Sequence, residues 1–390
     1  MRRRARTTVL ATALVLAFTA GPLAAPALAA TSADATAFAA PASAAPASEG
    51  QHGGPDVAAL EKALEGLPDK DATSAIVRVG GKGSWHGSAG VRDLRTGAKA
   101  LENARFRAGS TTKAVTAAVV LKLAAEGRID LDGTVQSYLP GLLTDAFEPI
   151  TVRQLLNYTS GLQGGKSLGD TVDEEYPHRF ETLTPEEVVA SSVAKGPRHA
   201  PGAAQHYGNI HYLVLAMLIE KVTGDTYEHQ AAVKVFKPLG MRHTSFPDGP
   251  DPRIHGPHNR GYEDMDGKLV DVTEWNMSDR WAAGDMISTA ADMERLLVGL
   301  FSGRLLPQPQ LKEMFTVPDV PGARYGAALE RFEVNGREIW GKTGARPGYH
   351  AVLAATRDLS RTVVYSVTAT SAKEDGLALA QRFAFPAFNS

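Results

Sequence analysis

The sequence predicts an α+β protein in which one antiparallel sheet, flanked by helices from both ends of the chain, carries an inserted, mostly helical lobe. Alternating segments typical of strands occur near residues 74–91 and again near 338–368. The region between them, approximately 107–300, is mainly helical in pattern. The first and last strands share one sheet if the helical block is an insertion. A cleft between the two lobes then becomes the expected place for a site.

Local signals predict the elements in chain order. A helix and two strands are expected at 57–64, 74–79 and 84–91. Helices of the inserted block are expected at 110–126, 151–158 and 210–222, and two more after the N-caps Thr184 and Thr289. Gly127 and Gly224 end two of these helices, because glycine adopts the left-handed cap conformation without strain. The closing strands and helix are expected at 338–342, 349–356, 362–368 and 372–383.

The first 55 residues are expected to lie outside the folded domain. Arginines near the start of the chain, a short apolar stretch and an A-x-A cleavage site predict a signal peptide over residues 1–29. The apolar stretch is too short to span a bilayer. Residues 30–55 are mostly alanine, proline, serine and glycine, which predicts a disordered linker. We therefore expect a domain over 56–390 that is secreted and extracellular, with no stable membrane anchor.

Composition narrows the possible partners and chemistry. The 390-residue chain has 41 basic and 43 acidic side chains and a formal net charge of −2. This balance disfavours nucleic acid and anionic membranes as partners. The chain has no cysteine, so it has neither a thiol nucleophile nor a disulfide. We expect a monomer that uses no cofactor and no metal, since His255 and His258 lie in a Pro/Gly loop without an evident third ligand.

The S-x-x-K segment from Ser110 to Lys113 carries the strongest functional signal. A serine hydroxyl is a weak nucleophile that needs a neighbouring base, and residues three apart share one face of a helix. A second S-x-x-K segment runs from Ser192 to Lys195, but it lacks the preceding glycine and the long apolar run that accompany Ser110. We predict Ser110 as the nucleophile and Lys113 as the base that activates it.

The Tyr-Gly-Asn segment at 207–209 supplies the second part of the predicted site. The phenol of Tyr207 can relay a proton to the leaving group, and the amide of Asn209 can hold Lys113 and a substrate amide. Asn209 also fits the N-cap of the following helix, a role that does not exclude the first. His206 is interpreted as a surface or supporting residue rather than a triad member, because no G-x-S-x-G elbow surrounds Ser110.

The third part is the strand segment Lys342-Thr343-Gly344, whose residues we predict to bind substrate. Lys342 can be the second cation that, with burial, favours the neutral amine of Lys113. A peptide-like substrate can pair with the backbone of this strand edge, because glycines allow close approach. The backbone amides of Ser110 and Ala345 are then the natural donors to an oxyanion.

With these three motifs in this order, the chain resembles the serine beta-lactamase and penicillin-binding protein superfamily. It is most similar to the secreted soluble D-alanyl-D-alanine carboxypeptidases grouped with class C beta-lactamases. The similar segments lie at 90–97, 106–113, 138–143, 150–156, 200–204, 217–224 and 300–306. The resemblance implies a two-lobed beta-lactamase-like fold and an acyl-enzyme on Ser110, with Lys113 and Tyr207 as the acid/base pair.

Three positions depart from the carboxypeptidase pattern. The similar carboxypeptidases usually have His-Thr-Gly in the last motif, where this chain has Lys342-Thr343-Gly344, as class C beta-lactamases do. The similar enzymes have arginine after the Y-G-x-G-L strand pattern and a hydroxyl residue after the last T-G, where this chain has Glu330 and Ala345. Both family residues hold the carboxylate at the end of the substrate. We expect Arg346, at the mouth of the cleft, to replace them, with Arg331 as the alternative. Glu330 is expected to point away from the cleft or to pair with a nearby arginine.

The resemblance implies a D-alanyl-D-alanine carboxypeptidase that acts on cell-wall peptides and is acylated by beta-lactams. One alternative in the same chemical class is a class C beta-lactamase-like hydrolase that acts on beta-lactams, esters or D-amino-acid amides. Another, of a different class, is a penicilloyl sensor that becomes acylated with little turnover. The fold alone does not select among these substrates.

Overall fold

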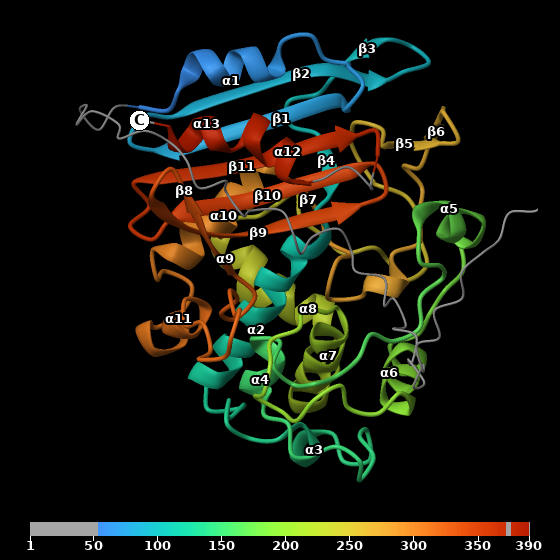
Figure 1. Ribbon diagram of the computed structural model, residues 1–390, viewed down its shortest axis with the longest axis vertical. Coiled ribbons are helices and arrows are strands. Elements are labelled where there is room, and N and C mark those ends of the chain that lie inside the picture. Colours follow the sequence, from blue (N-terminus) through green and yellow to red (C-terminus); the bar gives the residue numbers. More distant parts are fainter. Residues whose placement is uncertain (1–53, 372–375, 390) are drawn as a thin grey trace, which may run out of the picture.

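The computed structural model describes residues 54–371 and 376–389; the predicted signal peptide and residues 30–53 of the predicted linker lie outside this range. A seven-stranded antiparallel sheet forms the upper part of the molecule in Figure 1. Its strands, in spatial order, are β3 (Ala98–Lys99), β2 (Trp85–Asp93), β1 (Ala72–Gly81), β11 (Arg361–Ala369), β10 (Tyr349–Thr356), β9 (Arg337–Arg346) and β8 (Glu330–Val334). The first long strand β1 pairs with the last strand β11, which confirms that strands from both ends of the chain share one sheet and that the helical block between β3 and β8 is an insertion.

Terminal helices cover one face of the sheet, as the sequence predicts (Figure 1). These helices are α1 (Val57–Leu64), α12 (Gly376–Phe383) and α13 (Phe385–Phe388). Their apolar residues form one core with alternate residues of the central strands, such as Val352 and Ala354 of β10. The residues between them, such as Leu353, face the second and larger core. Both faces of the sheet are therefore buried, which explains the nearly continuous apolar sequence of β10 and β11.

A mostly helical lobe lies against the other face of the sheet. Its principal helices are α2 (Thr112–Ala125), α4 (Val152–Leu156), α6 (Pro185–Ala194), α7 (Ile210–Thr223), α10 (Ala290–Phe301) and α11 (Gln308–Met314). Shorter helices are α3 (Val135–Tyr138), α5 (Val172–Glu175), α8 (Tyr227–Ala231) and α9 (Lys237–Leu239). Thr184 and Thr289 are N-caps, and Gly224 ends α7 in the left-handed conformation, as predicted. No helix among the described residues combines the length and the apolar character needed to cross a membrane.

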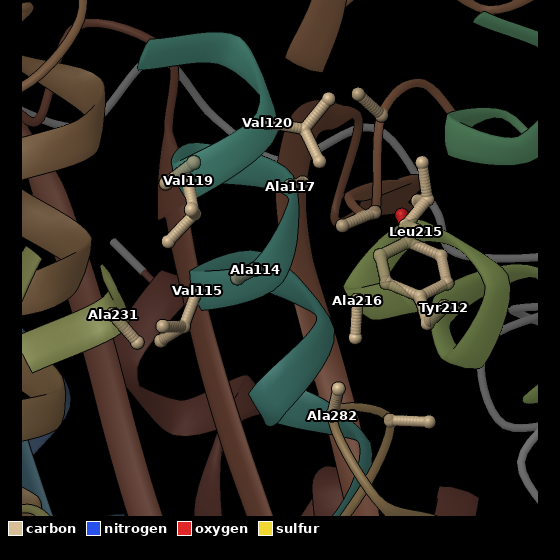
Figure 2. Close-up of a cluster of buried hydrophobic side chains, with 14 of the residues drawn as sticks. Ala114, Val115, Ala117, Val119, Val120, Tyr212, Leu215, Ala216, Ala231 and Ala282 are labelled. Carbon is tan, nitrogen blue, oxygen red and sulfur yellow. The ribbon is translucent and has the colours of Figure 1, made fainter. Parts of the chain in front are cut away.

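Helix α2 runs through the centre of the larger core. Figure 2 shows its apolar side chains between Ala231 on one side and Tyr212, Leu215 and Ala216 of α7 on the other. The alanines and valines from Ala114 to Val120 are fully buried around the whole circumference of the helix. A helix that is apolar all round belongs inside a protein. The first turn of α2 is thereby fixed in place before any ligand binds.

Short strands that the sequence patterns did not predict complete the lobe. They are β4 (Arg105–Arg107), which pairs with β7 (Ile287–Thr289), and β5 (Tyr262–Met265), which pairs with β6 (Lys268–Asp271). Strand β9 also extends to Arg346 rather than ending at residue 342. The predicted helix at 110–126 begins instead with a 3₁₀ turn, Gly109–Thr111, followed by α2. These differences matter because β4, the turn and the end of β9 meet at one place.

Candidate active site

The structure brings Ser110 and Lys113 into direct contact beneath the sheet. Ser110 lies in the 3₁₀ turn, and the Nζ atom of Lys113 in the first turn of α2 is 3.0 Å from its Oγ atom. Lys113 is fully buried, and Ser110 is 7% exposed. Lys113 also donates to Oδ1 of Asn209, 2.7 Å away, and to the carbonyl oxygen of Ala283, also at 2.7 Å. Three acceptors therefore hold the amine against the serine hydroxyl.

The carbonyl group of Ala283 is a part of this site that sequence reasoning missed. It lies in the loop that leads to β7, where the preceding Ala282 has a left-handed backbone with φ of 56°. Two threonines of α2 fix this loop: Thr116 donates to the carbonyl of Ala282 at 2.7 Å, and the hydroxyl of Thr112 accepts from the amide of Met286 at 3.2 Å. A backbone carbonyl has no residue signature, so no motif could have revealed it.

The side chain of Asn209 contacts Lys113 and does not cap helix α7. Asn209 occupies the N-cap position of α7, yet its side chain makes no capping hydrogen bond and accepts from Lys113 instead. Of the two roles considered for this residue, the structure shows the contact with the lysine. Asn209 thereby connects α7 of the helical lobe to the base of the nucleophile.

Tyr207 lies close to two buried lysines. The Nζ atoms of Lys113 and Lys342 are 4.9 and 4.6 Å from the centroid of its ring. Tyr325 packs on the same ring with a centroid distance of 5.4 Å, and Tyr158 with one of 5.0 Å. Both lysines are fully buried. Lys342 therefore lies near the same ring as Lys113, which is where the sequence predicts a second cation.

Two glycines allow the nucleophile turn to touch β9 backbone to backbone. A Cβ atom on Gly344 would lie 2.2 Å from the carbonyl oxygen of Ala108 and 3.0 Å from the amide nitrogen of Ser110. A Cβ atom on Gly109, whose φ is +53°, would lie 2.6 Å from the amide nitrogen of Ala345. The two amides predicted as oxyanion donors, those of Ser110 and Ala345, therefore belong to segments in direct contact.

The end of β9 beside this turn is available for backbone pairing on one side. Strand β8 pairs with β9 only from Arg337 to Gly341, whereas β10 pairs with β9 up to Arg346. Within the described residues, the edge of β9 over 342–346 thus has no neighbouring strand on the side of β8. An extended substrate can add to such an edge, as the sequence analysis expects for Lys342, Thr343 and Gly344.

Arg346 does not lie exposed at the mouth of the cleft, in contrast to the expectation. Its side chain is 5% exposed, and its Nη2 atom is 3.3 Å from Oδ1 of Asp279. The carboxylate of Asp279 also contacts Arg280 at 2.9 Å, which in turn contacts Glu175 at 3.3 Å. Burial raises the pKa of Glu175 above its ordinary value. The long arginine side chain turns inward because a fully buried carboxylate is there to pair with it.

Glu330 pairs with a nearby arginine, as predicted. Its buried carboxylate is 3.0 Å from Nη2 of Arg324, and Arg331 beside it is exposed. Gln205 fixes the adjoining segment: its Oε1 atom accepts from the amides of Arg324 and Tyr325, at 2.8 and 3.0 Å. Gln205 is a second residue that the sequence analysis missed, because an isolated glutamine carries no motif.

The remaining sequence candidates lie apart from these contacts. Ser192 and Lys195 each donate to a backbone carbonyl of the loop at 163–164, so this second S-x-x-K segment forms no serine–lysine pair. His206 is exposed and stacks near His199 with a centroid distance of 5.1 Å. His255 contacts the carboxylate of Asp251 at 2.7 Å. Within the described part of the chain, no three His, Asp or Glu residues are grouped as a metal site would need.

This arrangement is suited to acyl transfer. Lys113 can take the proton of Ser110 as the Oγ atom attacks a carbonyl carbon, and the two backbone amides can stabilise the resulting oxyanion. Tyr207 can return a proton to the leaving group, which departs and leaves an ester on Ser110. Water then hydrolyses the ester. Every group needed for this sequence of steps comes from the turn, α2, the segment just before α7 or the end of β9.

Comparisons with known proteins agree with this geometry. The sequence profile of the beta-lactamase family matches residues 59–384. The crystal structure of a D-stereospecific amidohydrolase from a Streptomyces species is 32% identical, has a TM-score of 0.74, and covers 85% of this chain and 99% of its own. A D-amino acid amidase from Ochrobactrum anthropi, in complex with D-phenylalanine, shares the fold with 24% identity, a TM-score of 0.72, and coverage of 85% and 98%.

The curated relatives are longer than the match. The putative penicillin-binding protein PbpX of Bacillus subtilis is 27% identical over 263 residues, which are 66% of this chain and 60% of that protein. Protein flp of Staphylococcus aureus is 30% identical over 221 residues, which are 55% of this chain and 42% of that protein. The chain thus spans about 60% or less of the length of these relatives. The family profile, the antiparallel sheet with its inserted helical lobe and the serine–lysine pair all lead to one conclusion: the chain belongs to the beta-lactamase family, within the superfamily of serine beta-lactamases and penicillin-binding proteins.

Proposed function

We propose that this protein is a D-stereospecific serine amidohydrolase. It attacks the carbonyl carbon of a D-residue with Ser110 and releases ammonia or an amine that carries no free carboxylate. The single observation that supports this choice is the position of Arg346, which is buried and paired with Asp279 at 3.3 Å. An arginine that grips the carboxylate of a substrate must present its guanidinium to the cleft.

The charges around the end of β9 support an uncharged leaving group. Arg346 already has a buried carboxylate partner, and Arg324 is paired with Glu330. Breaking a buried pair leaves an uncompensated charge, which costs ~3-5 kcal/mol. A substrate carboxylate that displaced Asp279 would therefore lose much of what the new contact contributes. A substrate whose leaving group is ammonia or an amine without a carboxylate does not need to displace Asp279 from Arg346.

The preference for a D-residue rests on similarity. The Streptomyces protein that is 32% identical to this chain is a D-stereospecific amidohydrolase, and the alignment covers almost all of that protein. Secretion of this chain, as a protein with a cleaved signal peptide, is part of the same proposal. The carboxypeptidase activity implied by the sequence resemblance is the competing hypothesis, because it acts at the same bond type but needs a carboxylate on the leaving D-alanine.

A matched pair of substrates distinguishes the two hypotheses. N-acetyl-D-alanyl-D-alanine and its C-terminal amide differ only in the terminal carboxylate, so the kcat/KM values for release of D-alanine and of D-alanine amide compare the two leaving groups directly. We expect the amide to be the better substrate by ~10-fold or more, the scale of one charged hydrogen bond, and D-phenylalanine amide to exceed its L-enantiomer by a similar factor. A faster reaction with the acid contradicts the amidase proposal and favours the carboxypeptidase.

Three variants complete this experiment. Ser110→Ala must abolish turnover and the covalent adduct seen by mass spectrometry, whereas Ser192→Ala, in the second S-x-x-K segment, keeps both. Arg346→Ala lowers kcat/KM for acid and amide by the same factor if Arg346 is structural. A loss confined to the acid would instead identify a carboxylate anchor. A lasting beta-lactam adduct without turnover of either substrate would favour the penicilloyl sensor.

A further inference from the structure

A cleft of about 790 Å³ lies outside the candidate active site. Residues from well-separated parts of the sequence line it: Asn103 and Arg105 at β4, Arg242 and His243 after α9, and Thr289 and Arg295 at the start of α10. None of these residues takes part in the acyl-transfer site described above. Three of them are arginines, whose guanidinium groups stay charged at any ordinary pH.

The positive charge of this cleft is only partly neutralised by the protein. Asp292 is the carboxylate next to the cleft, and it is fully buried with both oxygens occupied. Its Oδ2 atom accepts from the amide of His243 at 2.7 Å and from the hydroxyl of Thr244 at 3.0 Å, and its Oδ1 atom contacts Arg295 at 2.5 Å. One inward-facing acid is therefore present against three guanidinium groups.

The two other arginines have no acidic partner among the described residues. Arg105 donates through Nη1 to the carbonyl oxygen of His255 at 2.7 Å, a contact that leaves its charge uncompensated. Arg242 is exposed, and in the described part of the chain its guanidinium has neither a hydrogen bond nor an ion pair. The N-terminus of α10, a helix of 12 residues, adds a further partial positive charge at Thr289.

We propose that this cleft binds an anionic ligand that carries two or more phosphate groups. Guanidinium groups bind phosphate oxygens in pairs, and three of them around one cleft match several phosphates rather than one. The positive charge is local, since the whole chain has 41 basic and 43 acidic side chains. A volume of about 790 Å³ accommodates more than an inorganic ion, and Gly240, Pro257 and Ala291 supply an apolar wall for an organic part.

Such phosphate groups occur in two kinds of ligand, and a binding experiment can separate them. Inorganic tripolyphosphate represents a small free polyphosphate, and poly(glycerol phosphate) of about ten units represents a phosphodiester polymer. Each is titrated into the purified full chain by calorimetry at low and at physiological salt. We expect binding of at least one probe, weakened at higher salt because dissolved ions screen the attraction between the phosphate groups and the arginines.

Matched variants connect any binding to the cleft. Arg242→Ala and Arg295→Ala should each weaken binding by ~10-fold or more, the scale of a charged hydrogen bond. Arg304→Ala should leave it unchanged, because Arg304 is exposed beyond the other end of α10. Arg242→Ala should also keep the hydrolytic activity and the melting temperature of the parent, so that a loss of binding reports on the cleft alone.

Each outcome has a definite meaning. Binding of tripolyphosphate alone identifies a small polyphosphate as the ligand, and binding of the polymer alone identifies a phosphodiester chain. If neither probe binds, or if the Arg304→Ala variant loses as much affinity as the Arg242→Ala variant, the proposal is wrong. Because hydrolysis is measured separately, failure of this proposal leaves the proposed amidohydrolase function untouched.

Discussion

The aromatic ring of Tyr207 lies close to the amines of two buried lysines. The Nζ atoms of Lys113 and Lys342 lie 4.9 and 4.6 Å from its centroid, and water is excluded from both amines. A ring face attracts a cation, with an energy of ~2 kcal/mol when the cation is desolvated. The tyrosine thus serves in two ways: its ring holds both amines in position, and its hydroxyl is the proposed donor to the leaving group.

The substitution Tyr207→Phe separates these two roles, because it removes the hydroxyl and keeps the ring. We expect the rate of acylation to fall by ~10²-10⁴, the usual contribution of a positioned acid or base, while the melting temperature changes little. Single-turnover kinetics and thermal unfolding measure the two effects. Tyr325→Phe is the matched control, since it removes a neighbouring hydroxyl from the same aromatic cluster. Equal losses in both variants would show that Tyr207 is not the proton donor.

At the scale of elements, the site depends on one close contact between the 3₁₀ turn and β9. Neither segment could approach the other so closely if Gly109 or Gly344 carried a side chain. The contact places the amide of Ser110 beside that of Ala345, and it lies where β8 has already ended and one edge of β9 is open. The two proposed oxyanion donors and the open edge of β9 therefore lie at the same place in the fold.

We predict that Gly344→Ala disrupts this contact. The new methyl group would lie 2.2 Å from the carbonyl oxygen of Ala108, so one backbone must shift, at a cost of ~1-3 kcal/mol in the free energy of unfolding. A misplaced oxyanion donor should also lower kcat by ~10²-fold or more. Urea unfolding and steady-state kinetics test both effects.

The control for this substitution is Gly164→Ala. A Cβ atom on Gly164 has no neighbour within 4 Å, and its backbone is not left-handed, so stability and activity should stay close to those of the parent. If Gly344→Ala behaves like Gly164→Ala, the close contact is not needed for catalysis.

At the scale of the whole molecule, a buried histidine connects the active-site segments to the helical core. His211 of α7 is 1% exposed; its Nε2 atom lies 3.1 Å from the carbonyl oxygen of His206, next to Tyr207, and its Nδ1 atom lies 3.0 Å from the hydroxyl of Ser160. Burial lowers the pKa of His211 to about 3. The folded protein therefore keeps this imidazole neutral, whereas the unfolded chain takes up a proton near pH 6.5.

This difference predicts that the protein loses stability as the pH falls below about 6.5. Between pH 6.5 and about 3 the unfolded state binds the extra proton, so the free energy of unfolding falls by ~1.4 kcal/mol per pH unit from this group. Urea unfolding at pH 6.5 and pH 5 should show an additional loss of ~2 kcal/mol in the parent relative to His211→Gln.

Asp285 changes stability with pH in the direction opposite to His211, and its contribution cancels when the parent is compared with His211→Gln. Burial raises its pKa to about 8, so its contribution to stability is present at low pH and is lost as the pH rises from about 4 to about 8. Because Asp285 is the same in the parent and in His211→Gln, its effect cancels in the difference between them. A pH dependence that is identical in both proteins would contradict the role of His211.

The parts of the site that are encoded locally could be predicted from the sequence. The spacing of Ser110 and Lys113 predicted that the two side chains meet, although Ser110 lies in the 3₁₀ turn before α2, and the order of the other two motifs identified Tyr207, Asn209 and Lys342. The alternating strands near both ends likewise predicted that β1 and β11 share one sheet. The alternation of apolar and polar residues is a local property, so it can be recognised without knowledge of the tertiary structure.

Contacts between residues that are distant in the sequence could be learned only from the tertiary structure. The carbonyl of Ala283 accepts from Lys113, which is 170 positions away in the sequence. Arg346 pairs with Asp279, which is 67 positions away, and therefore does not lie at the expected place. The cationic cleft is likewise assembled from β4, the segment after α9 and the start of α10. A carbonyl oxygen has no residue signature, and a charged side chain turns toward whichever partner the fold brings near. The sequence therefore determined which groups carry the chemistry, and the packing of the two lobes determined which charges remain available to a ligand.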